Sequence, residues 1–174
     1  YGALTPEIQD RFDRVFVGYA EHQVAPYFGR RIEKVIHPPL IEYLSTPFGL
    51  KLNIYGILFT TRGCGVGCKF CQTPCFAPKP TPIPLESIER VVNYYKKNNI
   101  NVVIIEDENF GANRRHADRV VEILDEYDMV WGCMARADYL REKIDEWVAM
   151  RRRVARRDGS ARRMVSGFAG AAIG

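Results

Sequence analysis

Cysteine is the residue whose spacing offers the most specific chemistry in this chain. Three of the five cysteines, Cys64, Cys68 and Cys71, form a C-x3-C-x2-C run within eight residues, with glycines interleaved before and between them. Cysteine thiolates hold iron–sulfur clusters, and three of them this close in sequence can reach three corners of one cubane. The fourth iron would then be open to a substrate or cofactor, and the glycines would let the backbone bend closely around the cluster.

Other uses of the cysteines are less well matched by the spacing. A zinc site usually joins two separated pairs of ligands, and here only Cys133 and His116 stand outside the loop as further candidates. A ferredoxin-type cluster could take Cys75 as a fourth ligand, although Phe76 follows it where the bacterial run has proline. A phosphate-binding P-loop is excluded, because a cysteine separates the last glycine from the lysine and no Ser or Thr follows. The zinc and ferredoxin interpretations stay open.

The elements before and after this loop follow from hydrophobic periodicity. Leu52 to Thr60 is an aromatic and β-branched run that predicts a strand ending at the loop. Five prolines from Pro74 to Pro84 predict an extended segment. A helix ending near Asn98 and Asn99 is then predicted by apolar residues at helical spacing, namely Ile88, Val91, Val92 and Tyr95.

The same alternation continues after the first helix. Val102 to Ile105 and Met129 to Ala135 predict strands, with Asp138 as the N-cap of a helix beyond the second. A helix between the two strands is predicted by Ala117, Val120, Val121, Leu124 and Tyr127, and the last helix by Leu140, Ile144, Trp147 and Val148. With a fourth strand in the apolar run Ser166 to Gly174, this order predicts an α/β fold with a parallel sheet. Ligands of such a sheet gather at the carboxyl ends of the strands.

Composition and charge narrow the class of protein. The chain has 174 residues, 47% hydrophobic and 26% charged, as in an ordinary soluble globular protein. No apolar run approaches the roughly 18 residues that span a bilayer, and no signal peptide is recognised. The clustered cysteines suit a reducing compartment. We therefore expect a cytoplasmic protein without membrane contact. Of the net charge of +4, Arg151 to Arg163 carries +6 and the remainder −2. We expect that stretch to be a solvated helix end and loop rather than a nucleic-acid surface.

The cysteine loop resembles the signature of the radical S-adenosylmethionine (SAM) enzymes. It follows a first strand, and aromatic Phe70 precedes the third cysteine. The flanking residues resemble the subgroup with a cobalamin-binding domain ahead of the radical SAM domain: Thr61 to Gly63, Gln72 to Pro74, Asp107 to Gly111, and Arg136 to Asp138. The resemblance covers Leu52 to Gly174. Phe12 to Val17 contains a short strand-like piece. More weakly, Asp13 to Glu21, which overlaps it, resembles the last strand of a cobalamin domain.

The resemblance implies a fold, cofactors and partners. The fold would be a parallel (β/α) partial barrel of the radical SAM type, truncated after about four strands, in residues 51–174, with residues 1–50 a linker and remnant of a cobalamin-binding-like domain. Cys64, Cys68 and Cys71 would hold a [4Fe-4S] cluster that receives an electron from a reductant such as flavodoxin or ferredoxin. SAM bound to the open iron would yield methionine and a 5′-deoxyadenosyl radical, which takes a hydrogen atom from a small-molecule substrate.

The resemblance also implies candidates for binding SAM. Family members have a polar group after the second strand that contacts the SAM amine. Here Asp107 and Glu108 are the preferred candidates for this contact, and Asn109 is a secondary one. The role of Glu106 stays open, because the preceding strand is apolar throughout and does not reveal which of its faces points inward. Arg136 could pair with the SAM carboxylate. Cys75 and Cys133 are expected not to be ligands. We expect the chain to be a fragment that can assemble a cluster but is not fully active. The reaction of the whole enzyme would be cobalamin-dependent methyl transfer or rearrangement; the alternatives are an RNA-modifying radical SAM enzyme and an iron–sulfur electron carrier.

Overall fold

The protein has an α/β fold with a small mixed β-sheet, and the cysteine loop lies at the carboxyl ends of its parallel strands. The structure, a computed structural model, describes residues 5–16, 19–33, 37–45, 47–49 and 51–157. In chain order the elements are α1 (Pro6–Gln9), α2 (Glu21–Val24), the 3-10 helix η2 (Ala25–Phe28), β1 (Leu40–Ser45), β2 (Lys51–Leu58), β3 (Thr61–Arg62), α3 (Thr73–Phe76), β4 (Thr81–Pro82), α4 (Leu85–Lys97), β5 (Val102–Ile105), α5 (Arg114–Glu126), β6 (Val130–Cys133) and α6 (Ala137–Arg157).

The main sheet has the strand order β1-β2-β5-β6. Strands β2, β5 and β6 are parallel, and Leu58, Ile105 and Cys133 lie in register across them. This arrangement confirms the parallel sheet predicted from the alternation of strands and helices. Strand β1 pairs antiparallel with the outer edge of β2. No strand was predicted there, because the surrounding prolines obscured the short apolar segment.

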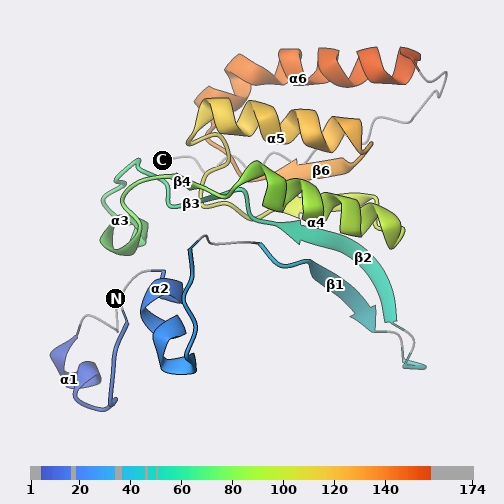
Figure 1. The fold of residues 1–174 in the computed structure, drawn as a ribbon. Coiled ribbons are helices and arrows are strands. Elements are labelled where there is room, and N and C mark those ends of the chain that lie inside the picture. The colour runs from blue at the N-terminus through green and yellow to red at the C-terminus, as the bar shows by residue number, and fades with distance from the viewer. Residues whose placement is uncertain (1–4, 17–18, 34–36, 46, 50, 158–174) are drawn as a thin grey trace.

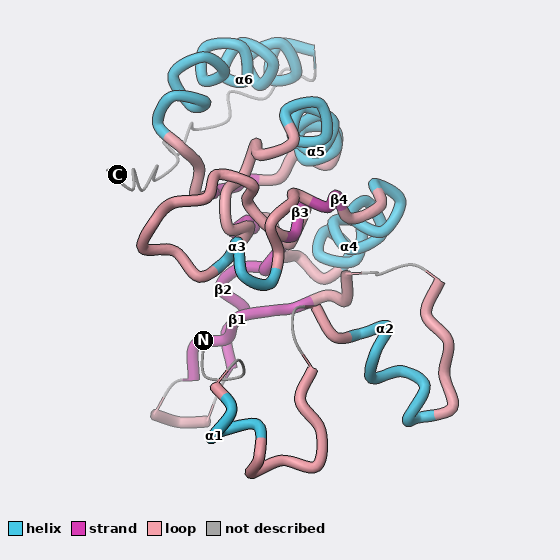
Figure 2. Tube along the Cα trace, turned by 90° about the vertical axis from the view of Figure 1, so that its left-hand side faces the viewer, coloured by secondary structure: helices cyan, strands magenta, loops and turns pink. Residues whose placement is uncertain are grey.

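Helices α4, α5 and α6 lie side by side over one face of the sheet (Figures 1 and 2). The predicted apolar stripe of α4, Ile88, Val91, Val92 and Tyr95, is fully buried there. Gly56 of β2 makes the close approach possible, since a Cβ at that position would lie 2.6 Å from the Tyr95 ring. The helix ends where Asn99 takes a left-handed φ of 58°, as the Asn98-Asn99 stop predicted.

Helix α5 begins at the cap Asn113, whose side chain accepts a hydrogen bond from the backbone N–H of His116. Its predicted apolar face is buried except for Tyr127, which is half-buried just after the helix. Helix α6 packs through Trp147, whose ring centroid lies 5.6 Å from that of Trp131 in β6. The face of the sheet that carries Leu58, Val103 and Trp131 is therefore the core face.

Several predictions about irregular segments differ from the structure. Phe12–Phe16 forms no strand, and Val17 lies outside the described residues. The proline segment is not extended throughout, because Pro74 occupies the first turn of α3, where its missing N–H costs nothing. Helix α6 begins at Ala137, so Asp138 lies within the first turn rather than at the N-cap.

The end of the predicted fold is described only in part. Arg151 to Arg157 continues α6 as helix. The rest of the arginine-rich stretch and the predicted fourth strand, Ser166 to Gly174, lie outside the described residues. Among the described residues, no helix is long and apolar enough to cross a membrane.

The carboxyl ends of the parallel strands meet at one edge of the sheet. In Figure 1 the arrowheads of β2 and β6 point toward the side where β3, β4 and α3 lie. Parallel strands bring the residues that follow them to the same edge, where α/β proteins bind ligands. The cysteine loop, the acidic run after β5 and Arg136 after β6 therefore belong to one region.

Candidate functional site

The cysteine loop is closed at its base by a two-stranded sheet. Strand β3 pairs antiparallel with β4, with Thr61 opposite Pro82 and Arg62 opposite Thr81. The backbone N–H of Ile83 also donates to the Thr60 carbonyl oxygen, at 2.9 Å. Residues 63–80 therefore leave and rejoin the sheet at one point, and the three cysteines lie on a loop with fixed ends.

Gly63 begins the loop in a conformation that only glycine tolerates there. Its φ is +81°, and a Cβ would lie 2.5 Å from the Lys79 carbonyl oxygen and 2.8 Å from that of Ala77. The outgoing and returning backbones of the loop are thus in contact next to Cys64. A side chain would have to separate them.

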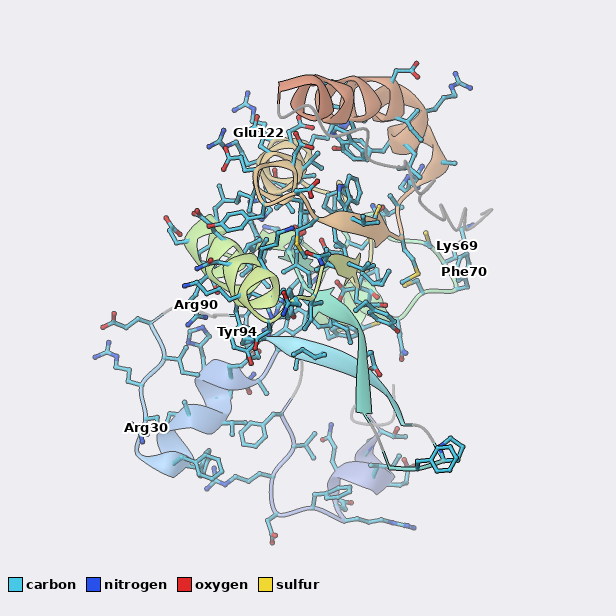
Figure 3. All side chains as sticks on the ribbon, turned by 90° about the vertical axis from the view of Figure 1, so that its right-hand side faces the viewer. Arg30, Lys69, Phe70, Arg90, Tyr94 and Glu122 are labelled. Atoms are coloured by element: carbon cyan, nitrogen blue, oxygen red, sulfur yellow. The ribbon has the colours of Figure 1, made fainter. Side chains whose placement is uncertain are left out.

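Cys64, Cys68 and Cys71 are all half-buried. The backbone N–H of Cys71 donates to the Cys68 carbonyl oxygen at 3.0 Å, which forms a turn between the second and third cysteines. The backbone N–H of Thr73 lies 3.4 Å from the Cys71 sulfur. Hydrogen bonding from Thr73 lowers the pKa of the Cys71 thiol, which favours the thiolate form that binds metals. Figure 3 shows the neighbouring Lys69 and Phe70 at the outer side of the molecule, and Phe70 is 85% exposed.

The acidic run after β5 alternates between buried and accessible positions. Asp107 is buried, Glu106 is half-buried and Glu108 is exposed. Asp107 accepts hydrogen bonds from the Thr60 backbone N–H at 2.6 Å, the Thr60 hydroxyl, and the Thr61 backbone N–H at 3.1 Å. Burial raises the pKa of Asp107 to about 6, against the opposing effect of these hydrogen bonds. The Asp107 carboxylate thus fixes the connection between β2 and β3.

Glu108 reaches the start of the cysteine loop instead. Its Oε2 accepts from the backbone N–H of Gly63 at 3.1 Å, and its Oε1 accepts from the Tyr19 hydroxyl. The Glu108 charge also opposes ionisation of the Cys71 thiol, which brings the carboxylate within electrostatic reach of the third cysteine. Of the acidic residues after β5, Glu108 is the one that contacts the loop.

Asn109 and Arg136 join the end of β5 to the end of β6. The buried Asn109 accepts a hydrogen bond from the backbone N–H of Arg136 at 3.1 Å. The exposed Arg136 guanidinium pairs with Asp138, its Nη2 lying 2.9 Å from Oδ2. The hydrogen bond and charge of Asp138 raise the pKa of Arg136, and the charges of the Cys68 and Cys64 thiolates act in the same direction. Arg136 is therefore within electrostatic reach of the first two cysteines.

A comparison with protein families identifies the domain. The model of the radical SAM superfamily matches residues 58–155, more than half of the chain, and the match includes the cysteine loop and both strand ends described above. The chain belongs to the radical SAM superfamily. The sheet with its three covering helices is the partial barrel expected for that family. No curated protein matches the chain.

The donor set of this radical SAM domain fits an iron–sulfur cubane. Within the described ranges, no group of three or more His, Cys, Asp or Glu residues is arranged to hold a single metal ion. A cubane has a different requirement, since each thiolate binds its own iron atom and the sulfurs are spread over the cluster. Three half-buried thiols on one closed loop meet that requirement, and Gly65 and Gly67, at φ +75° and +71°, give the loop backbone left-handed turns between the cysteines.

The two remaining cysteines of the radical SAM domain have different environments. Cys75 is exposed on α3, one turn beyond Cys71. Cys133 is buried in β6, where burial and the charge of Asp107 raise the pKa of its thiol to about 12. Cys133 is therefore a neutral thiol at physiological pH.

Three residues support the site in roles that the sequence did not predict. Thr60 holds Asp107, and its carbonyl oxygen lies 3.0 Å from Nε2 of His116 in α5. Tyr19 contacts Glu108 from a segment far from the loop in sequence. A threonine shortly before a metal-binding loop is a weak signal for Thr60. His116 was considered only as a zinc ligand, and no local pattern connects Tyr19 or His116 with the loop.

Proposed function

We propose that Cys64, Cys68 and Cys71 hold a [4Fe-4S] cluster and that the domain uses it to cleave SAM reductively. When bound, such a cluster supplies the electron that converts SAM to methionine and a 5′-deoxyadenosyl radical, which removes a hydrogen atom from a substrate. The observation that carries this proposal is the closed loop with three half-buried thiols at the carboxyl edge of the sheet, inside the radical SAM match.

The ends of β5 and β6 offer complementary groups for the amino acid part of SAM. Glu108 is exposed and has lone pairs beyond the two hydrogen bonds it accepts, so it can also receive an ammonium group. Arg136 can exchange Asp138 for the SAM carboxylate at little cost, because an exposed ion pair contributes little stability. The Asn109 side chain accepts a hydrogen bond from the Arg136 backbone, so it connects the ends of the two strands that carry Glu108 and Arg136.

Asp107 supports the same proposal from behind the site. Both of its oxygens accept hydrogen bonds from Thr60 and Thr61, which lead into the cysteine loop. Its contribution is to fix the position at which the loop leaves the sheet. The accessible carboxylates Glu106 and Glu108 are the better candidates for direct contact with SAM.

The finer form of the proposal is a cobalamin-dependent methyl transfer or rearrangement of a small molecule. It rests on the resemblance of the sequence around the loop, since the family match does not distinguish subgroups. The reductant would be a small electron carrier such as flavodoxin or ferredoxin. An RNA-modifying reaction and a fully ligated electron carrier are the alternatives.

Anaerobic reconstitution with iron and sulfide tests the proposal. We expect about four irons per chain, and a reduced cluster whose electron paramagnetic resonance signal changes when SAM is added, because the open iron gains ligands. A signal that does not change when SAM is added would favour the iron–sulfur electron carrier.

Single Ala substitutions separate the ligands from the other cysteines. Cys64→Ala, Cys68→Ala and Cys71→Ala should each lose the cluster, whereas Cys75→Ala and Cys133→Ala serve as matched controls and should keep it. Iron and sulfide analysis after reconstitution gives the readout. If Cys75→Ala lost iron as completely as Cys68→Ala, the cluster would be of the ferredoxin type.

A further inference from the structure

Tyr19 contacts Arg62, directly before the cysteine loop, and Phe76, within the loop, although it precedes the matched domain. Its hydroxyl donates to Glu108, 89 positions later in the chain. Its ring stacks edge-on against Phe76 of α3, with 6.1 Å between ring centroids. The guanidinium carbon of Arg62 lies 4.6 Å from the centroid of the Tyr19 ring, and Arg62 also pairs with Glu21. Arg62 comes directly before the loop and Phe76 lies at its far side, so one aromatic ring touches both.

The hydrogen bond from Tyr19 leads directly to the first cysteine. Glu108 receives the Tyr19 hydroxyl on one oxygen and the backbone N–H of Gly63 on the other, and Cys64 is the next residue. Burial, together with the hydrogen bond and charge of Glu108, raises the pKa of Tyr19 above its ordinary range. The hydroxyl is therefore protonated at neutral pH and remains a donor.

We propose that Tyr19 is a positioning residue for the cluster loop. Its hydroxyl orients Glu108 so that the carboxylate holds Gly63, and its ring packs against both Arg62, before the loop, and Phe76 in α3. The inference goes beyond the radical SAM match, which begins at residue 58. It rests on the proposed function only in taking the cluster as the ligand of the loop.

The hydrogen bond from Tyr19 to Glu108 also affects the charge beside the loop. This hydrogen bond partly neutralises the Glu108 carboxylate, which is held beside Cys64 by its bond to the Gly63 backbone N–H. Reduction adds negative charge to a cluster, so a nearby carboxylate disfavours the reduced form. Tyr19→Phe removes the donor and should shift the midpoint potential of the cluster to more negative values. Glu108→Gln removes the charge but keeps an acceptor for Gly63, and should shift the potential to more positive values.

Hydrogen–deuterium exchange of the cluster-free protein tests the positioning role directly. In Tyr19→Phe, amide exchange over residues 61–76 should be about three- to tenfold faster than in the unaltered protein, as expected for loss of a hydrogen bond to a charged group in a partly exposed site. Tyr27→Phe is the matched control. Tyr27 belongs to the same N-terminal segment and has Arg14 4.7 Å from its ring centroid and hydrogen-bonded to its hydroxyl. Among the described residues, its ring and hydroxyl contact Arg14 and Phe16 rather than the loop. Exchange over residues 61–76 should not change in this control.

Redox titration of the reconstituted protein provides the second measurement. Opposite shifts in Tyr19→Phe and Glu108→Gln, with Tyr27→Phe unchanged, would support the proposal, because general destabilisation cannot move the potential in two directions. Unchanged exchange over residues 61–76 in Tyr19→Phe, or shifts of the same sign in both variants, would overturn it. Failure of the unaltered protein to take up a cluster would refute the proposed function instead, and the exchange experiment would still decide the role of Tyr19.

Discussion

Asp107 offers the sharpest test of how the cysteine loop is attached to the sheet. Its carboxylate is 1% exposed and accepts hydrogen bonds from two backbone N–H groups and one hydroxyl, all belonging to Thr60 and Thr61. These donors are themselves buried and lie 46 or 47 positions away in the chain. Replacing Asp107 therefore tests a contact between β5 and the base of the loop.

Two variants separate the acceptors from the charge. Asp107→Asn keeps a carbonyl oxygen for the two backbone N–H groups, and its amide can donate to the Thr60 hydroxyl. Asp107→Ala removes every acceptor. Both variants lack the charge, so the difference between their unfolding free energies measures the lost acceptors. With about 1–3 kcal/mol for each of the two buried backbone N–H donors left unpaired, we expect the Ala variant to be less stable than the Asn variant by about 2–6 kcal/mol.

The effect of the Asp107 charge can be measured separately, from the pH dependence of stability. Burial raises the pKa of Asp107 from 3.8 to about 6, and Glu108 adds to the shift. The folded protein therefore binds this proton more tightly than the unfolded chain. The resulting stability is fully present below the unfolded pKa and is lost as the pH rises through the folded value. A shift of this size corresponds to about 3 kcal/mol, which Asp107→Asn should not lose.

Urea unfolding of the cluster-free, reduced protein at about pH 4 and about pH 7 gives the measurement. Relative to the unaltered protein, Asp107→Asn should gain stability by about 2 kcal/mol between the two values, less than the full shift because the unfolded carboxyl is already more than half ionised at about pH 4. Parallel pH dependence of the two proteins would refute the raised pKa. Equal stability of the Asn and Ala variants would refute the hydrogen bonds to Thr60 and Thr61.

Two further predictions concern the loop backbone and the basic helix end. Gly63→Ala brings a Cβ to 2.5 Å from the Lys79 carbonyl oxygen, so it should reduce iron uptake and cost more than the roughly 1–2 kcal/mol of a left-handed φ alone. Gly67→Ala, with φ +71° and open space around it, should cost only that amount and retain the cluster, and unfolding with iron analysis distinguishes the two. Arg151 to Arg163 should not confer specific RNA binding near physiological salt; a titration showing tight binding that is lost when these arginines are replaced would favour the RNA-modifying alternative.

Local regularities in the sequence determined most of the sheet and its helices. The apolar residues of α4 and α5 recur at helical spacing, so their buried faces could be predicted without knowing what covers them. The alternation of strands and helices likewise predicted the parallel pairing of β2, β5 and β6. The three cysteines could be assigned to a cluster because all three belong to one short loop, and their ligand role stays a prediction for reconstitution to test.

Only the tertiary structure decided which distant residues support that loop. Strand β1 exists as a strand because the edge of β2 offers unpaired backbone groups, and the proline-flanked sequence did not reveal this. Asp107 and Glu108 are adjacent in sequence, yet one is buried against Thr60 while the other reaches Gly63 and Tyr19. A carboxylate has the same chemistry at either position. What differs is the set of donors that the packed chain brings to it, and those donors come from segments too far apart in sequence for any local pattern to connect them.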